Sequence, residues 1–254
     1  MQLEDFREKL EKKQFVYGPF MKSMDPAFVE VVGHAGYDFA ILDMEHGPTD
    51  FSALQNLIRA AECSGILPIV RVSKLDEVCI ARALDVGAKG VQVPQIESAE
   101  EAVRAVEYAK YSPDGNRGVC RFVRAANYSA TDRFEYFREA NRNLVILQLE
   151  GCKPLEDIDA ILEVKGCDII FIGPYDLSQS LGVAGQVDHP LVEEKMSYIV
   201  DKATAKGVVV GTFVDNIPAA QKWKNLGVRY ISYSVDVGIF YEACLDIRKS
   251  LYDD

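Results

Sequence analysis

Two acidic residues occupy matching places in the chain, each next to a short apolar run. Glu150 ends the run Leu144–Glu150, and Asp176 follows the run Asp168–Gly173. Two carboxylates brought together repel one another, and a hard divalent cation with oxygen ligands removes that repulsion. The pair therefore predicts a site for an ion such as magnesium or manganese, although Asp176 could equally cap the helical turn that Asp-Leu-Ser opens.

Further polar residues stand at the ends of other segments. His46 follows the second apolar run and could be a general acid or base, because histidine titrates near neutral pH, or a loop residue without a task. Arg71 closes the third run, and a guanidinium at that depth needs an anion, either a structural partner or a substrate carboxylate. Asp85 ends a helical pattern, where a surface acid is the ordinary interpretation.

These residues would meet if the apolar runs are the strands of one barrel. Eight Val- and Ile-rich runs alternate with amphipathic segments, as in parallel strands covered on both faces. Eight such units in 254 residues match a (β/α)8 TIM barrel, whose active sites lie at the C-terminal strand ends. The predicted strands are Phe15–Met21, Phe39–Asp43, Leu67–Val72, Gly90–Pro94, Leu144–Glu150, Asp168–Gly173, Val208–Val214 and Tyr230–Ser234.

The segments between the strands support this organisation. Helical patterns cover Ser98–Tyr111, Leu155–Val164 and Pro218–Leu226, and the main irregular insertion is Ser112–Arg133. No change in composition divides residues 1–254, so we predict one barrel domain. A doubly wound open sheet is the alternative, but no GxGxxG follows the first strand. The glycines that should end helices are Gly87, Gly166 and Gly227.

Composition excludes several classes of function. The chain has 28 Lys and Arg against 39 Asp and Glu, a formal net charge of -11 that disfavours nucleic-acid and anionic-membrane partners. Its six cysteines show no CxxC spacing, which disfavours a zinc finger, and we interpret them as buried free thiols. The polar N-terminus and the absence of a long apolar stretch predict a soluble cytoplasmic protein.

Lysine chemistry is the main rival to a metal site. An imine-forming aldolase needs a lysine buried in a strand, and the sixth predicted strand has none. Lys22, Lys74 and Lys153 stand near strand ends but in polar loops. This arrangement favours metal chemistry over an imine.

An ordered set of motifs resembles a known family. The motifs are Asp43-Met44-Glu45-His46-Gly47, Val70-Arg71, Val93-Pro94, Arg117-Gly118-Val119, Gln148-Leu149-Glu150 and Ile172-Gly173-Pro174-Tyr175-Asp176-Leu177-Ser178. The ordered set is similar to the HpcH/HpaI aldolase/citrate lyase family, in particular its metal-dependent 2-keto-3-deoxy acid aldolase branch, from about Gly18 to Ser234.

The resemblance implies a binding site for a metal ion and a small 2-keto acid. Glu150 and Asp176 would bind Mg²⁺, Mn²⁺ or Co²⁺, and Gln148 would contact the keto acid. The loop that contains Gly173 and Pro174 would receive the substrate carboxylate.

The resemblance also implies a class II aldolase mechanism. Arg71 would face the keto or enolate oxygen, and His46, oriented by Asp85, would be the acid or base. The products would be pyruvate and an aldehyde, and the reverse reaction would join them. The family further implies a hexamer whose barrels exchange C-terminal helices, here the amphipathic segment Ile239–Leu251.

One stretch departs from that branch. Cys120 to Arg124 follow Arg117-Gly118-Val119 where small residues are usual, and Gly151 replaces a hydroxyl residue. Arg121 could bind a second substrate carboxylate or lie on the surface, and the role of Arg124 is equally open. The acceptor could then be a keto diacid such as oxaloacetate, as in a citrate synthase of the family. Two more functions stay open, a lyase or synthase that uses a CoA ester and a non-catalytic barrel scaffold.

Overall fold

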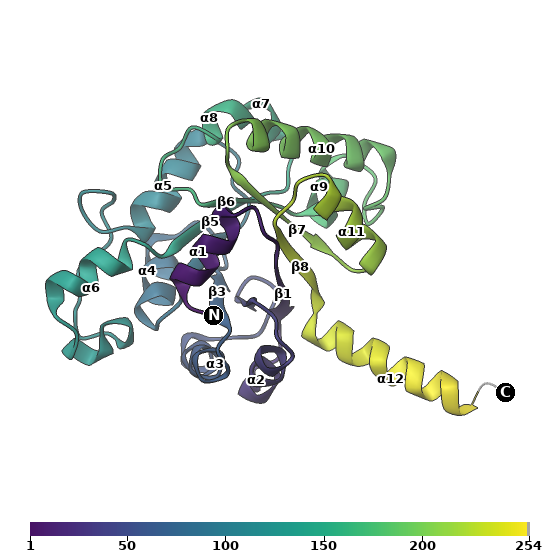
Figure 1. The fold of residues 1–254 in the computed structure, drawn as a ribbon. Coiled ribbons are helices and arrows are strands. Elements are labelled where there is room, and N and C mark those ends of the chain that lie inside the picture. The colour runs from purple at the N-terminus through teal and green to yellow at the C-terminus, as the bar shows by residue number, and fades with distance from the viewer. Residues whose placement is uncertain (253–254) are drawn as a thin grey trace.

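Eight parallel strands close into a barrel in the computed structural model, which describes residues 1–252. Each strand pairs with the next, and β8 pairs with β1 (Figure 1). The predicted (β/α)8 fold is confirmed, and each predicted strand limit agrees with the structure to within one residue. The strands are β1 (Val16–Met21), β2 (Phe39–Asp43), β3 (Leu67–Arg71), β4 (Gly90–Val93), β5 (Leu144–Leu149), β6 (Ile169–Ile172), β7 (Val209–Val214) and β8 (Tyr230–Val235).

Helices follow the strands and cover the barrel. The segment predicted as one helix, Leu155–Val164, is instead two four-residue helices, α7 and α8. The insertion Ser112–Arg133 contains only the short turn η1 (Arg124–Ser129). The helices are α1 (Leu3–Glu11), α2 (Pro26–His34), α3 (Phe51–Ser64), α4 (Glu77–Asp85), α5 (Ala99–Ala109), α6 (Arg133–Ala140), α7 (Lys153–Glu156), α8 (Ile158–Ile161), α9 (Pro174–Ser180), α10 (Pro190–Ala205), α11 (Ile217–Asn225) and α12 (Asp236–Tyr252).

Glycines stop several helices before the next strand begins. Gly87, Gly166 and Gly227 have φ values of 111°, 89° and 109°, in the left-handed region that other residues avoid. The chain reverses there and enters the N-terminal end of a strand. The stops predicted at Gly87 and Gly227 are therefore confirmed, whereas α8 already ends at Ile161, five residues before Gly166.

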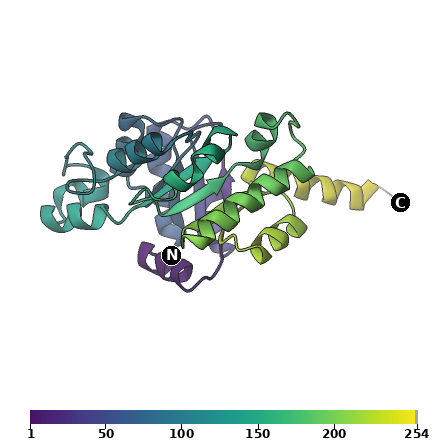
Figure 2. The same cartoon turned by 90° about the horizontal axis from the view of Figure 1, so that it is seen from above.

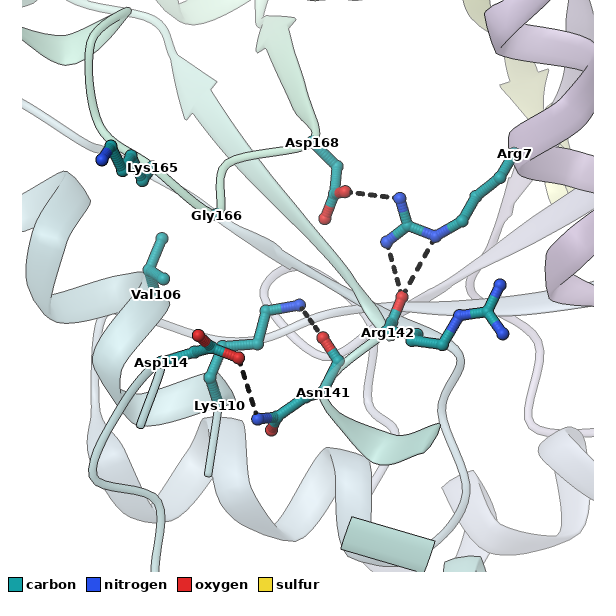
Figure 3. Close-up of a pocket in the computed structure, with 9 residues that line it drawn as sticks. All are labelled: Arg7, Val106, Lys110, Asp114, Asn141, Arg142, Lys165, Gly166 and Asp168. Carbon is teal, nitrogen blue, oxygen red and sulfur yellow. Dashed lines mark hydrogen bonds and ion pairs between the residues drawn. The ribbon is translucent and has the colours of Figure 1, made fainter. Parts of the chain in front are cut away.

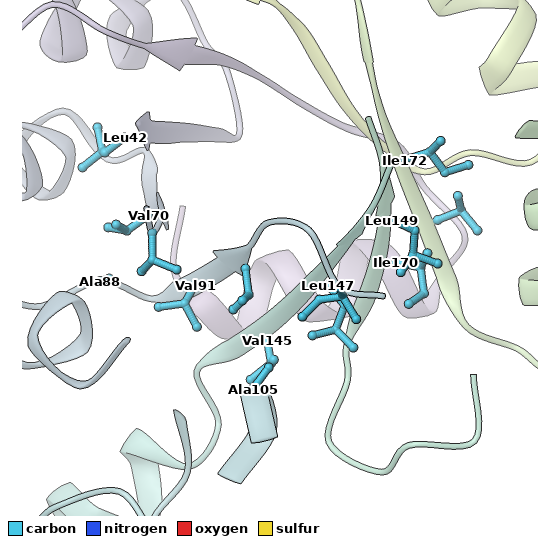
Figure 4. Packing of buried hydrophobic residues seen from close by; sticks show 14 of the residues in the cluster. Leu42, Val70, Ala88, Val91, Ala105, Val145, Leu147, Leu149, Ile170 and Ile172 are labelled. Atoms are coloured by element: carbon cyan, nitrogen blue, oxygen red, sulfur yellow. The ribbon is translucent and has the colours of Figure 1, made fainter. Parts of the chain in front are cut away.

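The apolar residues form one layer inside the barrel and another between the strands and the helices. Outward-facing side chains of neighbouring strands, such as Val91, Val145 and Leu147, meet the covering helices (Figure 4). At the N-terminal end of the barrel, α1 inserts the fully buried Phe6 against the rings of Phe39 and Tyr230. This plug leaves the C-terminal end as the open face.

The last helix, α12, points away from the barrel (Figures 1 and 2). Its first residue, Asp236, is its only buried one, whereas Phe240, Tyr241, Ile247 and Leu251 are all exposed. The predicted helix Ile239–Leu251 lies within it. So much exposed apolar surface is unusual for a helix without a partner.

The cysteines and the membrane prediction have different outcomes. Within residues 1–252, no helix is long and apolar enough to cross a membrane. All six cysteines are free, but Cys63, Cys120 and Cys244 are exposed. The predicted burial of the cysteines is wrong, because these three lie on solvent-facing positions of a helix or loop and Cys79, Cys152 and Cys167 are only partly buried.

Candidate active site

A cavity of about 340 Å³ opens at the C-terminal ends of the strands. The position agrees with the general rule for this fold. Six residues expected at the site from sequence line it together. They are His46, Arg71, Gln148, Gly173, Pro174 and Asp176.

Arg71 is held by two buried acids at the side of this cavity. Its Nε donates to Asp43 Oδ1 at 2.9 Å and its Nη2 to Asp43 Oδ2 at 2.8 Å. Nη1 lies 2.9 Å from Glu45 Oε2. Burial alone would raise the pKa of Asp43, but the hydrogen bond and charge of Arg71 lower it below its usual value. The structural partner expected for Arg71 is therefore present, and two of its five N–H groups are left for a ligand.

The register of the barrel explains this pairing. Asp43 stands opposite Arg71 across β2 and β3, and Arg71 stands opposite Gln92 across β3 and β4. Side chains at paired positions in neighbouring strands point to the same side of the sheet. The three side chains thus reach the barrel interior at one level.

Glu150 lies in a cradle of amides at the floor of the site. Its Oε1 accepts a hydrogen bond from Gln95 N at 2.8 Å, and Oε2 accepts one from Gln148 Nε2. Gln92 Nε2 in turn donates to Gln148 Oε1 at 2.6 Å. A Cβ on Gly173 would lie 2.6 Å from Glu150 Oε2, so only glycine leaves room for this carboxylate.

The carboxylates of the site repel one another. Burial raises the pKa of Glu150 to about 7; the Gln148 hydrogen bond opposes the rise, and the charges of Glu45 and Asp176 add to it. Burial, with Asp43 and Asp176, also raises the pKa of Glu45. Asp176 itself is exposed in the first turn of α9.

The carboxylate oxygens of this site suit a hard cation that takes few ligands from the protein. Glu150 and Asp176 offer oxygen ligands, and a divalent ion would relieve the repulsion that raises the pKa of Glu150. Within the described residues, no group of three or more His, Cys, Asp and Glu is arranged to hold a metal. Magnesium-type ions commonly bind through one or two carboxylates and complete their shell with water and substrate, so the two-carboxylate set fits.

His46 and a group of aromatic rings complete the cavity wall. His46 is exposed, and its side chain makes no hydrogen bond to a described residue. Its backbone N–H donates to Asp43 Oδ1 at 3.3 Å, which fixes the turn after β2. The rings of Phe20, Phe171 and Phe213 form the apolar side, and the Arg71 guanidinium lies 4.5 Å from the centroid of the Phe20 ring.

Asp85 and Arg121, predicted as site residues, and Arg124, whose role was open, lie elsewhere within the chain. Asp85 is the last residue of α4, a helix that runs back to the N-terminal end of the barrel, and it pairs with Arg117 at 2.5 Å. Arg121 belongs to the insertion at that same end and lies over the ring of Phe122. Arg124 donates to Val86 O and pairs with Glu62. Within a single chain, therefore, none of these three side chains reaches His46.

A second, larger cavity of about 580 Å³ lies at the N-terminal end of the barrel (Figure 3). Arg7 donates to Asp168 Oδ1 at 2.8 Å, and Asp168 Oδ2 accepts from Val145 N. The buried Lys110 donates to the carbonyl oxygens of Asn141 and Asn143. These bonds tie helix ends and strand starts together, so we assign the chemistry to the smaller cavity.

A family model described as HpcH/HpaI aldolase/citrate lyase matches residues 17–243. This chain belongs to the HpcH/HpaI aldolase/citrate lyase family. The family consists of enzymes that make or break carbon–carbon bonds, generally with a divalent metal ion. The chain is accordingly a carbon–carbon lyase of the aldolase type.

Relatives and solved structures agree with this membership. A hydroxypyruvate/pyruvate aldolase of Paraburkholderia phytofirmans is 34% identical over 91% of this chain and 91% of its own. A 5-keto-4-deoxy-D-glucarate aldolase of Escherichia coli is 35% identical over 94% and 93%. A crystal structure of a family protein from Burkholderia cenocepacia matches with a TM-score of 0.92, at 32% identity over 97% of this chain and 98% of that one.

Several residues of this HpcH/HpaI site were not expected from the sequence. Asp43 and Glu45 belong to a recognisable motif that suggested no role for them, although the parallel register could have predicted Asp43 beside Arg71. Gln95, with φ of 56°, offers its backbone N–H to Glu150, and no sequence signal marks that conformation. Lys22, expected in a polar loop, lines the cavity.

Proposed function

We propose that this chain is a divalent-metal-dependent aldolase that cleaves 4-hydroxy-2-keto acids to pyruvate and an aldehyde, or joins the two. The observation that carries the proposal is the convergence of Arg71, Gln148, Glu150 and Asp176 on one end of the barrel beside an open cavity. A non-catalytic scaffold has no need for buried carboxylates that repel one another.

Glu150 and Asp176 hold the metal ion in this proposal. A bound Mg²⁺, Mn²⁺ or Co²⁺ supplies a positive charge where the keto oxygen becomes negative. Gln148 keeps Glu150 in place and faces the keto acid. Backbone N–H groups at the start of α9, beyond Gly173 and Pro174, bind the substrate carboxylate, as helix N-termini favour anions.

Arg71 and His46 divide the remaining chemistry. In cleavage, the bond between carbons 3 and 4 breaks, and its electron pair forms the enolate of pyruvate. Arg71 stabilises the enolate oxygen with the two N–H groups that its acidic partners leave free. His46 takes the proton of the 4-hydroxyl as the aldehyde forms, and a proton added to carbon 3 of the enolate completes pyruvate.

The chemistry is tested by removing the metal and by following pyruvate alone. We expect chelation to abolish cleavage, and Mg²⁺, Mn²⁺ or Co²⁺ to restore it. In heavy water, enzyme and metal should exchange the methyl protons of pyruvate without any aldehyde, as NMR would show. His46→Ala should slow cleavage by roughly a hundred- to ten-thousandfold and exchange by less. Full activity after chelation, or a borohydride-trapped pyruvyl-lysine, would contradict the mechanism.

We further propose that the chain assembles into a hexamer by exchanging α12. The exposed apolar side chains of α12, among them Phe240, Ile247 and Leu251, support a partner surface. Burial of such side chains is worth about 1.5–3 kcal/mol each. The roles expected for Asp85 and Arg121 then require a neighbouring subunit, because each lies at the other end of its own barrel.

The assembly proposal has its own experiment. Truncation after Val237 removes the apolar surface of α12 and should yield smaller or aggregated species in light scattering. Charge substitutions on the polar positions Glu242 and Lys249 serve as controls that should leave the mass unchanged. A stable monomer of the intact chain at micromolar concentration would contradict the exchange.

A further inference from the structure

Lys22 is a cation of the catalytic cavity that no step above uses. It follows directly after Met21, the last residue of β1, and lines the cavity with His46 and Arg71. Its side chain is 32% exposed and donates no hydrogen bond to any residue from 1 to 252. Its nearest acid, Asp43 Oδ2, lies 4.0 Å from Nζ, and that oxygen already accepts a bond from Arg71.

The backbone that carries Lys22 is fixed by a buried acid. Asp236 Oδ1 accepts a hydrogen bond from Lys22 N at 3.0 Å, and Oδ2 accepts one from Ser23 N at 2.8 Å. Asp236 is only 4% exposed. Two such charge-assisted bonds hold the start of this loop in one conformation, so the lysine stem leaves the wall at a defined place.

The order of strands puts Lys22 across the cavity from the proposed metal ligands. Lys22 follows β1, Glu150 follows β5, and Asp176 follows β6. In a closed barrel of eight strands in sequential order, β1 and β5 lie on opposite sides. A substrate whose keto acid end lies at β5 and β6 therefore extends its other end toward β1. The aromatic side of the cavity, with Phe20 and Phe213, flanks that path.

We propose that Lys22 determines specificity by binding a carboxylate at the far end of the aldehyde acceptor. The inference rests on the proposed aldolase function and names the class of acceptor: an aldehyde with an anionic group remote from its carbonyl. Arg71 cannot take this part, because Asp43 and Glu45 use three of its N–H groups and the proposed mechanism uses the other two for the enolate oxygen. Within one chain, Arg121 lies at the other end of the barrel and does not line this cavity.

The test compares two aldehydes of equal length that differ in charge. Succinic semialdehyde has a carboxylate at its far end, and its methyl ester does not. With the metal-loaded full chain and pyruvate, we expect wild type to favour the acid in kcat/KM. Lys22→Met should reduce that preference on the order of tenfold or more, the effect of losing one bond to a charged group.

Two further variants separate charge from other roles. Lys22→Arg keeps the charge and cannot form an imine with pyruvate, so it should retain most of the preference. Lys74→Met removes a lysine near the end of β3 that does not line the cavity, and should leave the ratio at its wild-type value. An unchanged ratio in Lys22→Met would overturn the assignment, as would a loss that appears in the KM for pyruvate instead.

Proton exchange of pyruvate separates this inference from the proposed function. Wild type that exchanges pyruvate protons, with an aldehyde ratio that Lys22→Met does not alter, would leave the aldolase proposal standing and remove Lys22 from it. Wild type that exchanges no protons under any metal would overturn the proposed function itself.

Discussion

The two ends of the barrel use charged residues in opposite ways. In the N-terminal cavity of Figure 3, Asp168 accepts bonds with both oxygens and Lys110 donates to two carbonyl oxygens. In the C-terminal cavity, by contrast, burial raises the pKa of Glu150, and the charges of Glu45 and Asp176 add to that rise. Asp168 and Lys110 are satisfied by hydrogen bonds at the N-terminal end, whereas the carboxylates at the C-terminal end repel one another.

This difference indicates that charged residues at the N-terminal end serve stability, whereas those at the C-terminal end serve function. Hydrogen-bonded charges at the N-terminal end fasten helix ends to strand starts, so their removal should weaken the fold. Like charges held together at the C-terminal end lower stability, and a ligand that neutralises them recovers it. Removal of one of these carboxylate charges should therefore raise the free energy of unfolding. Removal of a residue that pairs with a buried acid should instead lower it.

Arg71 pairs with a buried acid, and its removal should have the largest effect on both stability and activity. Arg71→Ala leaves Asp43 buried and unpaired, which should lower the free energy of unfolding by about 3–5 kcal/mol. Loss of the enolate stabiliser should lower both pyruvate exchange and cleavage on the order of a hundredfold or more. Urea denaturation and NMR exchange measure the two effects.

A double variant separates the two roles of Arg71. Arg71→Met with Asp43→Leu replaces this ion pair by apolar side chains and should recover part of the stability, because only Glu45 is then left without its cation. Activity should stay low. If activity returned with stability, Arg71 would serve the fold alone and the contrast between the two ends would fail.

Lys110 tests the other end of the barrel. Lys110→Met leaves the carbonyl oxygens of Asn141 and Asn143 without their donor, and should lower the free energy of unfolding by about 1–3 kcal/mol. The kcat/KM for cleavage should stay within about twofold of wild type, since the lysine is remote from the catalytic cavity. Lys165→Met, at an exposed position in the same cavity, is the matched control and should change neither quantity. A Lys110→Met variant that loses activity while it keeps its stability would contradict the assignment of this end of the barrel to stability.

Removal of the Glu150 charge should have the smallest effect on stability, and it should stabilise the protein rather than destabilise it. The folded state raises the pKa of Glu150 to about 7, so its ionisation above that pH works against folding. With metal removed by chelation, Glu150→Gln should raise the free energy of unfolding by about 1–2 kcal/mol at pH 8, less than the full shift because one hydrogen bond is altered. The gain should vanish as the pH falls through 7 toward 4.5, where the wild-type carboxyl becomes protonated. Asp168→Asn should instead lose stability, and a loss in Glu150→Gln at pH 8 would contradict the proposed repulsion.

The fold and half of the site could be predicted because both follow from periodicity and topology. Apolar runs alternating with helices fixed the strand limits, and parallel strands place their ends at one rim, which brought Arg71, Glu150 and Asp176 together. The same rule could have placed Asp85 at the opposite end, because it ends a helix rather than a strand. The bond from Gln92 to Gln148 depends on barrel register and rotamers, and the left-handed backbone of Gln95 has no marker in its side chain.

Asp236 links the C-terminal helix to the catalytic cavity, so an engineer cannot exchange the whole helix without affecting the cavity. This one carboxylate begins α12 and also anchors the loop after β1. A chimera that takes its last helix from a related barrel must be joined after residue 236, because a junction before it would remove the anchor and let Lys22 shift. Two barrels with identical cavity residues could thus inherit different substrate preferences from the point at which their tails were exchanged.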